Sequence, residues 1–580
     1  MSLDLKDETG ATIACQIKIK LSSVPEPELN GKSSINFSIE EASTITSPST
    51  AKLLCILTML PAGILVGDLA TMAPSISNID EITGMLTDMS LASVRQGERI
   101  ELLSPVKAQL LNYQLDDDTR KHIYFYHFKQ AEQGLLKPGD SLFKEAMQKL
   151  VENQLNVESV LMDALENGCI PAIEATLQYS SPRCAIKPRM DILERAVKTA
   201  IAEETSKPEI VAREDGTMAL TARCMQRLGE MRIESGMYKN SCIKEMDFEM
   251  DYFAQAMERF EKLGDSNAIA YCQFYVAERI WINNSNKGIQ HLEKTRDDFI
   301  AMGDAAGAVK CELRLGNYYL GPEIHDAIPR AFGAFHRALT QSNDPYHRAL
   351  CNQLLSSIYV RNGRMDDAHS LLDTALKAYQ DFGDRAAVAM CLQSMANLHI
   401  HSHRHDDACA ALRQAIAEDT WLGRDLKAAF VKWRLGDMCD DEEAVELYQQ
   451  AIPQFHASLF VFADAECRWC LGRRYMQMGR FSDALSHLEI ARHQMVLNGT
   501  HELAMKCLMH IMEAMCRDGN TEGAKLMLEE NITEIRAFLI QQENVHGIRE
   551  EDLKLTIENG KLTVESLAPH KPSDDNDSAE

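Results

Sequence analysis

The chain has 580 residues, a formal net charge of −26 and an isoelectric point of about 5.2. A protein with this much negative charge repels phosphate backbones and anionic lipid surfaces. We therefore expect neither nucleic acid nor a membrane as a partner. No secretory signal opens the sequence, and its 16 cysteines are scattered without the spacing of a disulfide framework. These features predict a cytoplasmic protein. A chain of 580 residues is too long for a single hydrophobic core, so we expect several domains or a repeat array.

The first motif in chain order is Gly31-Lys32-Ser33, which matches the end of a phosphate-binding loop. Such a loop needs a glycine at position 26, where this chain has Glu26, and Pro25 and Pro27 remove N–H donors. No later strand ends in the paired acids of a Walker B site. We therefore expect residues 1–50 to be an N-terminal extension, with no bound nucleotide and no cofactor.

Residues 51–115 contain three short helical segments followed by two short strands around a turn at Gly97. This order is typical of a winged-helix module. The third helical segment carries Asp80, Glu81 and Asp88 and no basic residue, so contact with DNA would be repulsive. Residues 116–220 have the pattern of connecting helices.

From residue 221 to 545 the sequence is periodic. Similar four-residue junctions end at Asp265, Asp304, Asp344, Asp384, Arg424 and Asp464. Their successive separations are 39, 40, 40, 40 and 40 residues, and a fixed period of this length indicates stacked helical pairs. The sequence therefore predicts a mainly α fold, an α-α superhelix preceded by the small winged-helix module.

One stretch defines the repeated unit. Eight residues in it have the spacing of a tetratricopeptide repeat: Leu471, Gly472, Tyr475, Gly479, Phe481, Ala484, Leu488 and Ala491. Small residues in this pattern let two helices approach closely, while the larger ones fill the space between them. The unit is thus predicted to be tetratricopeptide-like.

The C-terminal part divides into two segments. Residues 546–567 alternate in hydrophobicity around Asn559-Gly560, which predicts a β-hairpin. Residues 568–580 are polar and acidic, and we expect them to be a disordered tail.

Residues 31–135 resemble the segment that follows the nucleotide-binding domain in fungal STAND NTPases, which are NLR-like (NACHT or NB-ARC) receptors with tetratricopeptide tails. The matching stretches are Ser34–Ile39, Leu60–Ile64 and Leu103–Pro105. The family's NTPase core would lie before this segment, where only about thirty residues stand. The resemblance implies a chain equivalent to the C-terminal half of such a protein, lacking the NTPase core. It also implies a separate NTPase as a partner.

Two clusters suggest metal or redox chemistry. His399, His401, His403 and His405 alternate along "HIHSHRHDD" and would share one face of a strand, where they could bind zinc or nickel. In the helical register, His399 is a packing residue and only His399 and His403 lie one turn apart. Cys467 and Cys470 have a zinc or redox spacing but no completing ligands. The helical interpretation predicts no metal site and no catalytic residue.

First helices of such repeats line a concave groove that binds peptides or helices. Counting from Leu471 places seven residues in the predicted partner-binding groove: Asn317, Ser357, Arg361, Asn397, Trp433, Trp469 and Arg473. The two tryptophans occupy equivalent positions in adjacent repeats, where they either anchor a ligand or pack against neighbouring helices.

These features predict a non-enzymatic scaffold or sensor that binds a protein or peptide. A regulatory subunit that docks on a separate STAND NTPase is the second hypothesis. A metal-dependent hydrolase built on the histidines is the third.

Overall fold

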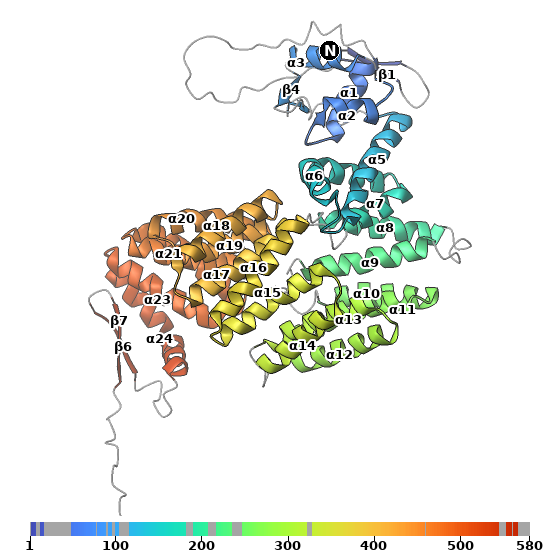
Figure 1. Ribbon diagram of the computed structural model, residues 1–580. Coiled ribbons are helices and arrows are strands. Elements are labelled where there is room, and N and C mark those ends of the chain that lie inside the picture. Colours follow the sequence, from blue (N-terminus) through green and yellow to red (C-terminus); the bar gives the residue numbers. More distant parts are fainter. Residues whose placement is uncertain are drawn as a thin grey trace, which may run out of the picture. The chain divides into compact units, whose positions relative to one another are not determined.

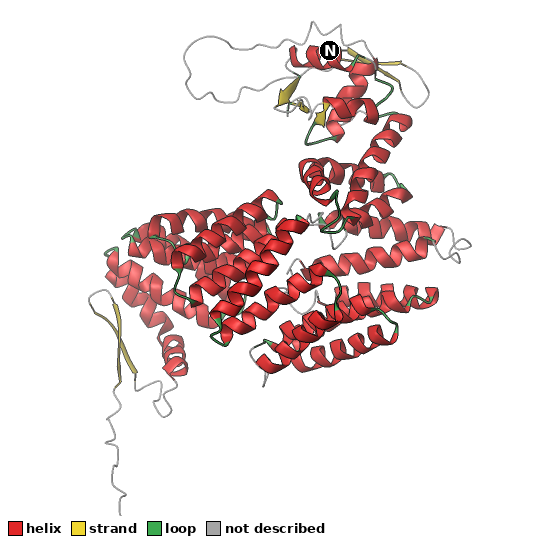
Figure 2. Cartoon of the chain, in the orientation of Figure 1, coloured by secondary structure: helices red, strands yellow, loops and turns green. Residues whose placement is uncertain are grey.

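The computed structural model describes residues 2–6, 12–16, 48–76, 78–88, 91–95, 99–103, 115–180, 189–206, 216–234, 246–321, 327–458, 460–543, 553–558 and 561–566. Most of these residues are helical (Figures 1 and 2). The chain divides into two compact units. The first comprises residues 1–234, 248–311 and 381–384, and the second comprises residues 235–247, 312–380 and 385–580.

The N-terminal elements include three helices and two small sheets. They are β1 (Ser2–Lys6), β2 (Thr12–Gln16), α1 (Pro48–Met59), β3 (Ile64–Leu65), α2 (Val66–Met72), α3 (Ile79–Asp88), β4 (Ala92–Arg95) and β5 (Arg99–Leu102). β1 pairs with β2, and a three-stranded antiparallel sheet has the order β3-β5-β4. Three helices thus precede the β4–β5 pair, although the winged-helix assignment itself stays a prediction. Gly31–Ser33, Ser34–Ile39 and Ser104–Pro105 lie outside the described residues.

Four helices and a short 3-10 turn follow in the first unit. They are α5 (Asp117–Glu132), η1 (Gln133–Leu135), α6 (Phe143–Glu166), α7 (Ile170–Tyr179) and α8 (Met190–Ser206). The side chain of Asp116 accepts a hydrogen bond from the Thr119 backbone N–H and so caps α5.

The loop between α1 and β3, part of the family-like segment Leu60–Ile64, is held against α6. Buried Asn156 accepts a hydrogen bond from Ala62 N–H at 2.8 Å and donates one to the Gly63 carbonyl at 2.7 Å. Arg99 donates to the carbonyls of Ala62 and Gly63, both at 3.1 Å. Gly63 has a φ of +67°, where a side chain would be strained. These bonds fix the N-terminal elements to α6.

The remaining helices form consecutive pairs. The first helix of each pair is α9 (Thr217–Glu234), α11 (Ser266–Asn283), α13 (Ala305–Tyr319), α15 (Pro345–Arg361), α17 (Arg385–His401), α19 (Asp425–Gly436), α21 (Val461–Gln477) or α23 (His501–Arg517). The second is α10 (Met246–Leu263), α12 (Ser285–Ala301), α14 (Ala327–Gln341), α16 (Met365–Phe382), α18 (His405–Trp421), α20 (Asp441–Ala457), α22 (Phe481–Leu497) or α24 (Thr521–Glu543). The tetratricopeptide-like solenoid predicted from the sequence is confirmed.

Tight turns join most of these helices. At the end of α15, Gly363 has a φ of +73° and the Arg364 N–H bonds back to the Tyr359 carbonyl at 2.9 Å. This six-to-one bond is the Schellman arrangement, which favours glycine because of its positive φ. His403 occupies the equivalent position after α17, with a φ of +55°. A histidine therefore stands where α15, α21 and α23 are followed by Gly363, Gly479 and Gly519.

One predicted junction is wrong. Asp464 lies inside α21 rather than before it, and its side chain is 1% exposed. The reason is that α19 has 12 residues, whereas α17 and α21 have 17 each, so α21 begins at Val461. Asp464 accepts hydrogen bonds from Arg468 Nε and Gln494 Nε2, each at 2.8 Å. It is a buried, paired carboxylate and not a junction residue.

Six of the 16 cysteines follow the repeat, a regularity that the sequence analysis did not identify. These six occupy one equivalent, fully buried position in the first helices, and we call them the cysteine ladder: Cys272, Cys311, Cys351, Cys391, Cys467 and Cys507. Three of their thiols point at a carbonyl of the preceding second helix, the shortest contact being Cys507 Sγ to Leu488 O at 3.1 Å. The position takes a small apolar side chain because two repeats meet there. Val431 fills it in α19.

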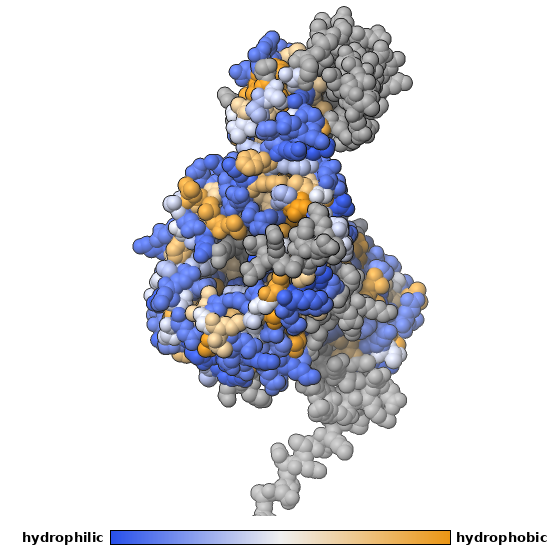
Figure 3. Space-filling view, turned by 90° about the vertical axis from the view of Figure 1, so that its right-hand side faces the viewer, coloured by the Kyte–Doolittle hydropathy of each residue, from blue (hydrophilic) through white to orange (hydrophobic). Residues whose placement is uncertain are grey.

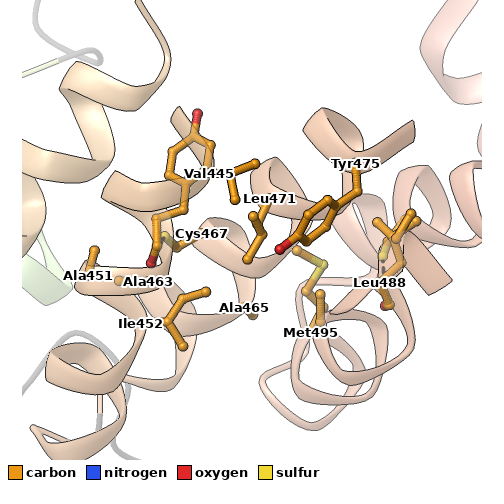
Figure 4. Close-up of a cluster of buried hydrophobic side chains, with 14 of the residues drawn as sticks. Val445, Ala451, Ile452, Ala463, Ala465, Cys467, Leu471, Tyr475, Leu488 and Met495 are labelled. Atoms are coloured by element: carbon orange, nitrogen blue, oxygen red, sulfur yellow. Dashed lines mark hydrogen bonds between the residues drawn. The ribbon is translucent and has the colours of Figure 1, made fainter. Parts of the chain in front are cut away.

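A buried cluster of the second unit spans α19 to α23 (Figure 4). Leu471 and Tyr475 of α21 and Leu488 and Met495 of α22 are among its members. At Gly472 an added Cβ would lie 2.6 Å from Leu488 Cγ. The close approach predicted for this repeat position is therefore present.

Strands β6 (Leu553–Glu558) and β7 (Lys561–Ser566) pair antiparallel after the last helix. The acidic tail, residues 568–580, lies outside the described residues. The face drawn in Figure 3 is mostly hydrophilic, with hydrophobic side chains in separate patches. Among the helices that the structure describes, none combines the length and apolar character needed to cross a bilayer.

Candidate ligand-binding surface

The predicted groove residues begin with a row of polar side chains on the first helices of the second unit. We call the row the polar ladder, and its members are Asn317, Ser357, Asn397, Asp437 and Arg473. All five are exposed. Four lie on α13, α15, α17 and α21, and Asp437 directly follows the last residue of α19; the intervals are 40, 40, 40 and 36 residues. The side of these helices that carries the ladder is named the first-helix face.

The neighbouring helices are linked across this face. Arg434 of α19 donates a hydrogen bond to the side-chain oxygen of Asn397 on α17. Arg474 of α21 donates to the carbonyls of Gly436 and Asp437, both at 3.3 Å, and so caps the short helix α19. These bonds hold α17, α19 and α21 in register, which keeps the ladder positions in a row.

Trp433 lies four residues before Asp437 and is half-buried. Its ring packs edge-on against buried Phe455, with ring centres 6.1 Å apart, and is tilted against Phe430 at 6.4 Å. It also lies beside the Cys470 thiol of α21, whose pKa burial raises to about 11. Trp433 is therefore partly buried: its ring packs on the core cluster, and its indole nitrogen is enclosed.

Trp469 occupies the equivalent position on α21 and is also half-buried. The Arg473 guanidinium lies over its ring, 5.3 Å from the ring centre. Its indole nitrogen is 3.3 Å from His510 Nδ1, which lies only 2.7 Å from the Lys506 carbonyl. The shorter contact requires a proton on Nδ1, so this nitrogen donates to Lys506 and cannot accept from Trp469. The indole N–H of Trp469 is thus left for another acceptor.

The other predicted groove residues differ in their surroundings. The Ser357 hydroxyl donates to the Leu354 carbonyl of its own helix at 2.6 Å. Arg361 is exposed at the last position of α15. Asp437 accepts a hydrogen bond from the Tyr448 hydroxyl at 2.7 Å. The structure thus places Arg473 over Trp469, and Trp433 one turn before Asp437, while Asn317, Ser357 and Arg361 belong to earlier repeats.

Three side chains of this face were missed by sequence reasoning. Met390 and Phe430 are 45% and 36% exposed, and Glu466 is half-buried. Each lies seven residues before a ladder residue, two helical turns along the same face. These three side chains could have been found from the sequence by reading the positions seven residues before each ladder residue.

The histidine run does not form a strand. His399 is buried in α17 and His401 is the last residue of that helix. His403 lies in the turn and His405 begins α18. Burial lowers the pKa of His399, and its ring lies 6.1 Å from that of His369. Alternate positions on one strand face, which the metal hypothesis required, do not occur here.

No group of three or more His, Cys, Asp or Glu side chains in the described ranges is placed to hold a metal ion. Cys467 belongs to the cysteine ladder, and Cys470 lies one turn further along α21. Burial raises the pKa of both thiols, which disfavours the thiolate that a metal or a redox reaction would need.

The sequence matches no protein-family model and no curated protein. Among solved structures, it is similar to a STAND protein with a tetratricopeptide repeat sensor from Pyrococcus horikoshii, at 12% identity and a TM-score of 0.39. That match covers 89% of this chain and 60% of the archaeal one, so this chain spans less than two thirds of that protein's length.

Two further solved structures are similar. A Rap protein complexed with Competence and Sporulation Factor matches at 12% identity and a TM-score of 0.38, over 67% of this chain and 99% of that one. A putative kinesin light chain with tetratricopeptide-like repeats from Podospora anserina matches at 18% identity and a TM-score of 0.28, over 35% of this chain and 100% of that one. At these values the likeness is one of fold only.

Proposed function

We propose that this protein is a non-enzymatic interaction scaffold or sensor that binds an extended peptide segment on the first-helix face of its second unit. The observation that carries the proposal is the combination of the exposed polar ladder with half-buried Trp433 and Trp469 beside it. Polar groups at regular intervals suit the backbone of an extended chain, and large aromatic side chains provide affinity.

The tryptophans suit a binding role because each is held by a neighbouring side chain and remains partly accessible. Trp433 is backed by Phe455 and Trp469 is contacted by Arg473. Anchors that are already ordered lose little conformational entropy when a ligand arrives. Because each indole packs against a neighbour and remains partly accessible, the proposal keeps the ligand-anchor alternative beside the packing one.

A relation to the sensor half of NLR-like STAND proteins is part of this proposal. It is supported by the family-like segment Leu60–Ile64, by the tetratricopeptide-like repeats and by the order of elements between α1 and β5. In such a protein the repeats would bind the ligand and a separate NTPase would dock on the N-terminal elements. Co-purification of an NTPase that is lost on deleting residues 51–115 would support this second role.

The binding function can be tested with peptides selected on the intact protein. Twelve-residue peptides would be selected by phage display, and their affinities measured by fluorescence anisotropy on wild-type protein and on the double variant Trp433→Phe and Trp469→Phe. Phenylalanine keeps the packing against the core but removes the indole, so we expect affinity to fall about tenfold or more.

Trp421→Phe is the matched control, because Trp421 ends the second helix α18 and is stacked with Arg385 at 4.1 Å. We expect its affinities to equal those of the wild-type protein. Failure to select any peptide, or equal binding by the double variant, would contradict the proposed function.

A further inference from the structure

Two histidines meet where the preceding repeat has two uncharged aromatic side chains. His399 is buried near the end of α17, and its ring lies edge-on to that of His369 on α16, with ring centres 6.1 Å apart. In the preceding repeat the corresponding contact joins Tyr359 of α15 to Phe332 of α14, again edge-on, at 6.4 Å. Tyr359 and His399 occupy the same position of their first helices, 40 residues apart. A neutral aromatic pair is therefore replaced by a pair that can take up protons.

The surroundings of His399 favour its neutral form. Among the described residues, its Nδ1 atom is enclosed and has no hydrogen-bond partner, so the neutral ring can place its lone pair there. A proton added to Nδ1 would be a buried N–H without an acceptor, which costs free energy. Burial lowers the pKa of His399, and the positive charge of Arg404 lowers it further.

The acidic side chains that face His399 already have basic partners. Asp407 of α18 is bonded to Arg404 at 2.7 Å, and Asp373 of α16 lies 2.8 Å from Nδ1 of His369. Both carboxylates act to raise the pKa of His399, but burial and the two basic groups outweigh them. Acid also gives His369 a positive charge. A protonated His399 would therefore lie beside two cations, with no carboxylate of its own.

The arginine that follows this position suits a neutral ring. In the preceding repeat the Arg364 guanidinium lies over Tyr359, 4.6 Å from the ring centre. Arg404 follows His399 by the same five residues. A neutral aromatic face attracts a guanidinium, whereas a protonated imidazole carries a like charge and repels it. The same repeat geometry that stabilises a tyrosine thus penalises a charged histidine.

We propose that the contact between His369 and His399 is a pH-sensitive joint, at which acid loosens the packing of α17 against α16. The pKa of His399 is lower in the packed state than in an opened one, so packing is fully favoured above the ordinary value of 6.5 and weakens as the pH falls below it. Asn397 of the polar ladder precedes His399 by two residues, so the loosened segment includes part of the first-helix face. The inference requires no ligand and is independent of the proposed function.

Hydrogen–deuterium exchange of the intact protein at pH 7.5 and pH 5.5, corrected for the intrinsic pH dependence of exchange, measures this loosening locally. We expect the protection of α17 to fall by about threefold or more relative to that of α15. The double variant His369→Phe with His399→Tyr restores the pair of the preceding repeat, and this fall should disappear. His401→Tyr is the matched control and should keep the fall, because His401 is exposed at the end of the same helix.

The reverse change transfers the joint to another repeat. Phe332→His with Tyr359→His should make the protection of α15 fall at pH 5.5 by a similar factor. If the first double variant does not fold, His399→Gln, which keeps a neutral polar side chain, should also remove the fall in α17. The inference would be overturned by an unchanged protection of wild-type α17 at pH 5.5, or by an equal fall in a folded variant without His399.

Discussion

At Gly472 the absence of a side chain lets α21 lie against α22. An added Cβ would be 2.6 Å from Leu488 Cγ, too close for any real contact. We therefore expect Gly472→Ala to lower the free energy of unfolding by about 1–3 kcal/mol, as overpacking does. Urea unfolding followed by circular dichroism would measure the change.

Gly84→Ala is the control, because Gly84 is also helical but a Cβ added there would meet no atom within 4 Å. Alanine there should be neutral or stabilise by about 0.5–1 kcal/mol. If both substitutions had the same effect, the tight helix contact at Gly472 would be contradicted.

His403 is a second residue whose backbone conformation determines its contribution to folding stability. Its φ of +55° lies in the left-handed region, which costs a residue with a Cβ about 1 kcal/mol. We expect His403→Gly to stabilise the protein by roughly that amount, measured by thermal or urea unfolding. The reverse change, Gly363→His, occupies the equivalent turn in open space and should destabilise it similarly. A destabilising His403→Gly would mean that the imidazole contributes more than the strain costs.

At the scale of elements, the cysteine ladder shows that the same residue type recurs at the equivalent position of six first helices. Burial raises the pKa of Cys391 and Cys507 to about 12 and that of Cys351 to about 11. A raised pKa keeps the thiol protonated, so the reactive thiolate is scarce at every pH below the shifted value.

We therefore expect the six ladder cysteines to resist iodoacetamide at pH 8 in the native protein. They should react at the rate of a small thiol after unfolding in guanidinium chloride, and peptide mapping by mass spectrometry would assign each site. Modification of a ladder cysteine in the folded protein at the small-thiol rate would show that the repeats open locally.

Helix α19 illustrates how a shortened helix shifts the register of the repeats that follow it. Its 12 residues shift the start of α21 to Val461 and convert Asp464 from a supposed turn residue into a buried partner of Arg468. The backbone of α19 ends where Arg474 reaches back from the next first helix. The shortening therefore leaves the carbonyls of Gly436 and Asp437 to be bonded by Arg474 of the next first helix.

At the scale of the whole molecule, the net charge of −26 produces repulsion between carboxylates that the compact state must overcome. Screening reduces this repulsion, so we expect the melting temperature at pH 7.5 to rise by about 2 °C or more between 20 and 300 mM NaCl. Exposed ion pairs such as Arg404–Asp407 oppose the effect only weakly.

Repeating the melts near pH 5.2, where the net charge approaches zero, provides the internal control. The rise with salt should disappear there. A melting temperature that falls with NaCl at pH 7.5 would mean that local ion pairs outweigh the net repulsion.

The solenoid could be predicted from sequence because each repeat makes the same local contacts. Positions such as Leu471, Gly472 and Ala484 recur at a fixed spacing, so periodicity alone indicates paired helices and even the side of the first helix that faces outward. The polar ladder follows from the same register, and all of its members are exposed as that register requires. Ligand binding by these residues stays a prediction, as do the domain boundaries.

Tertiary structure decided what depends on contacts between repeats. Asp464 and Glu466 are both acidic residues near the start of α21, yet Asp464 is buried and paired whereas Glu466 is half-buried. Their roles differ because α20 and α22 cover one side of α21 and leave the other free. The periodicity of the sequence predicts the order of the helices. The neighbours that each side chain contacts depend on how those helices pack.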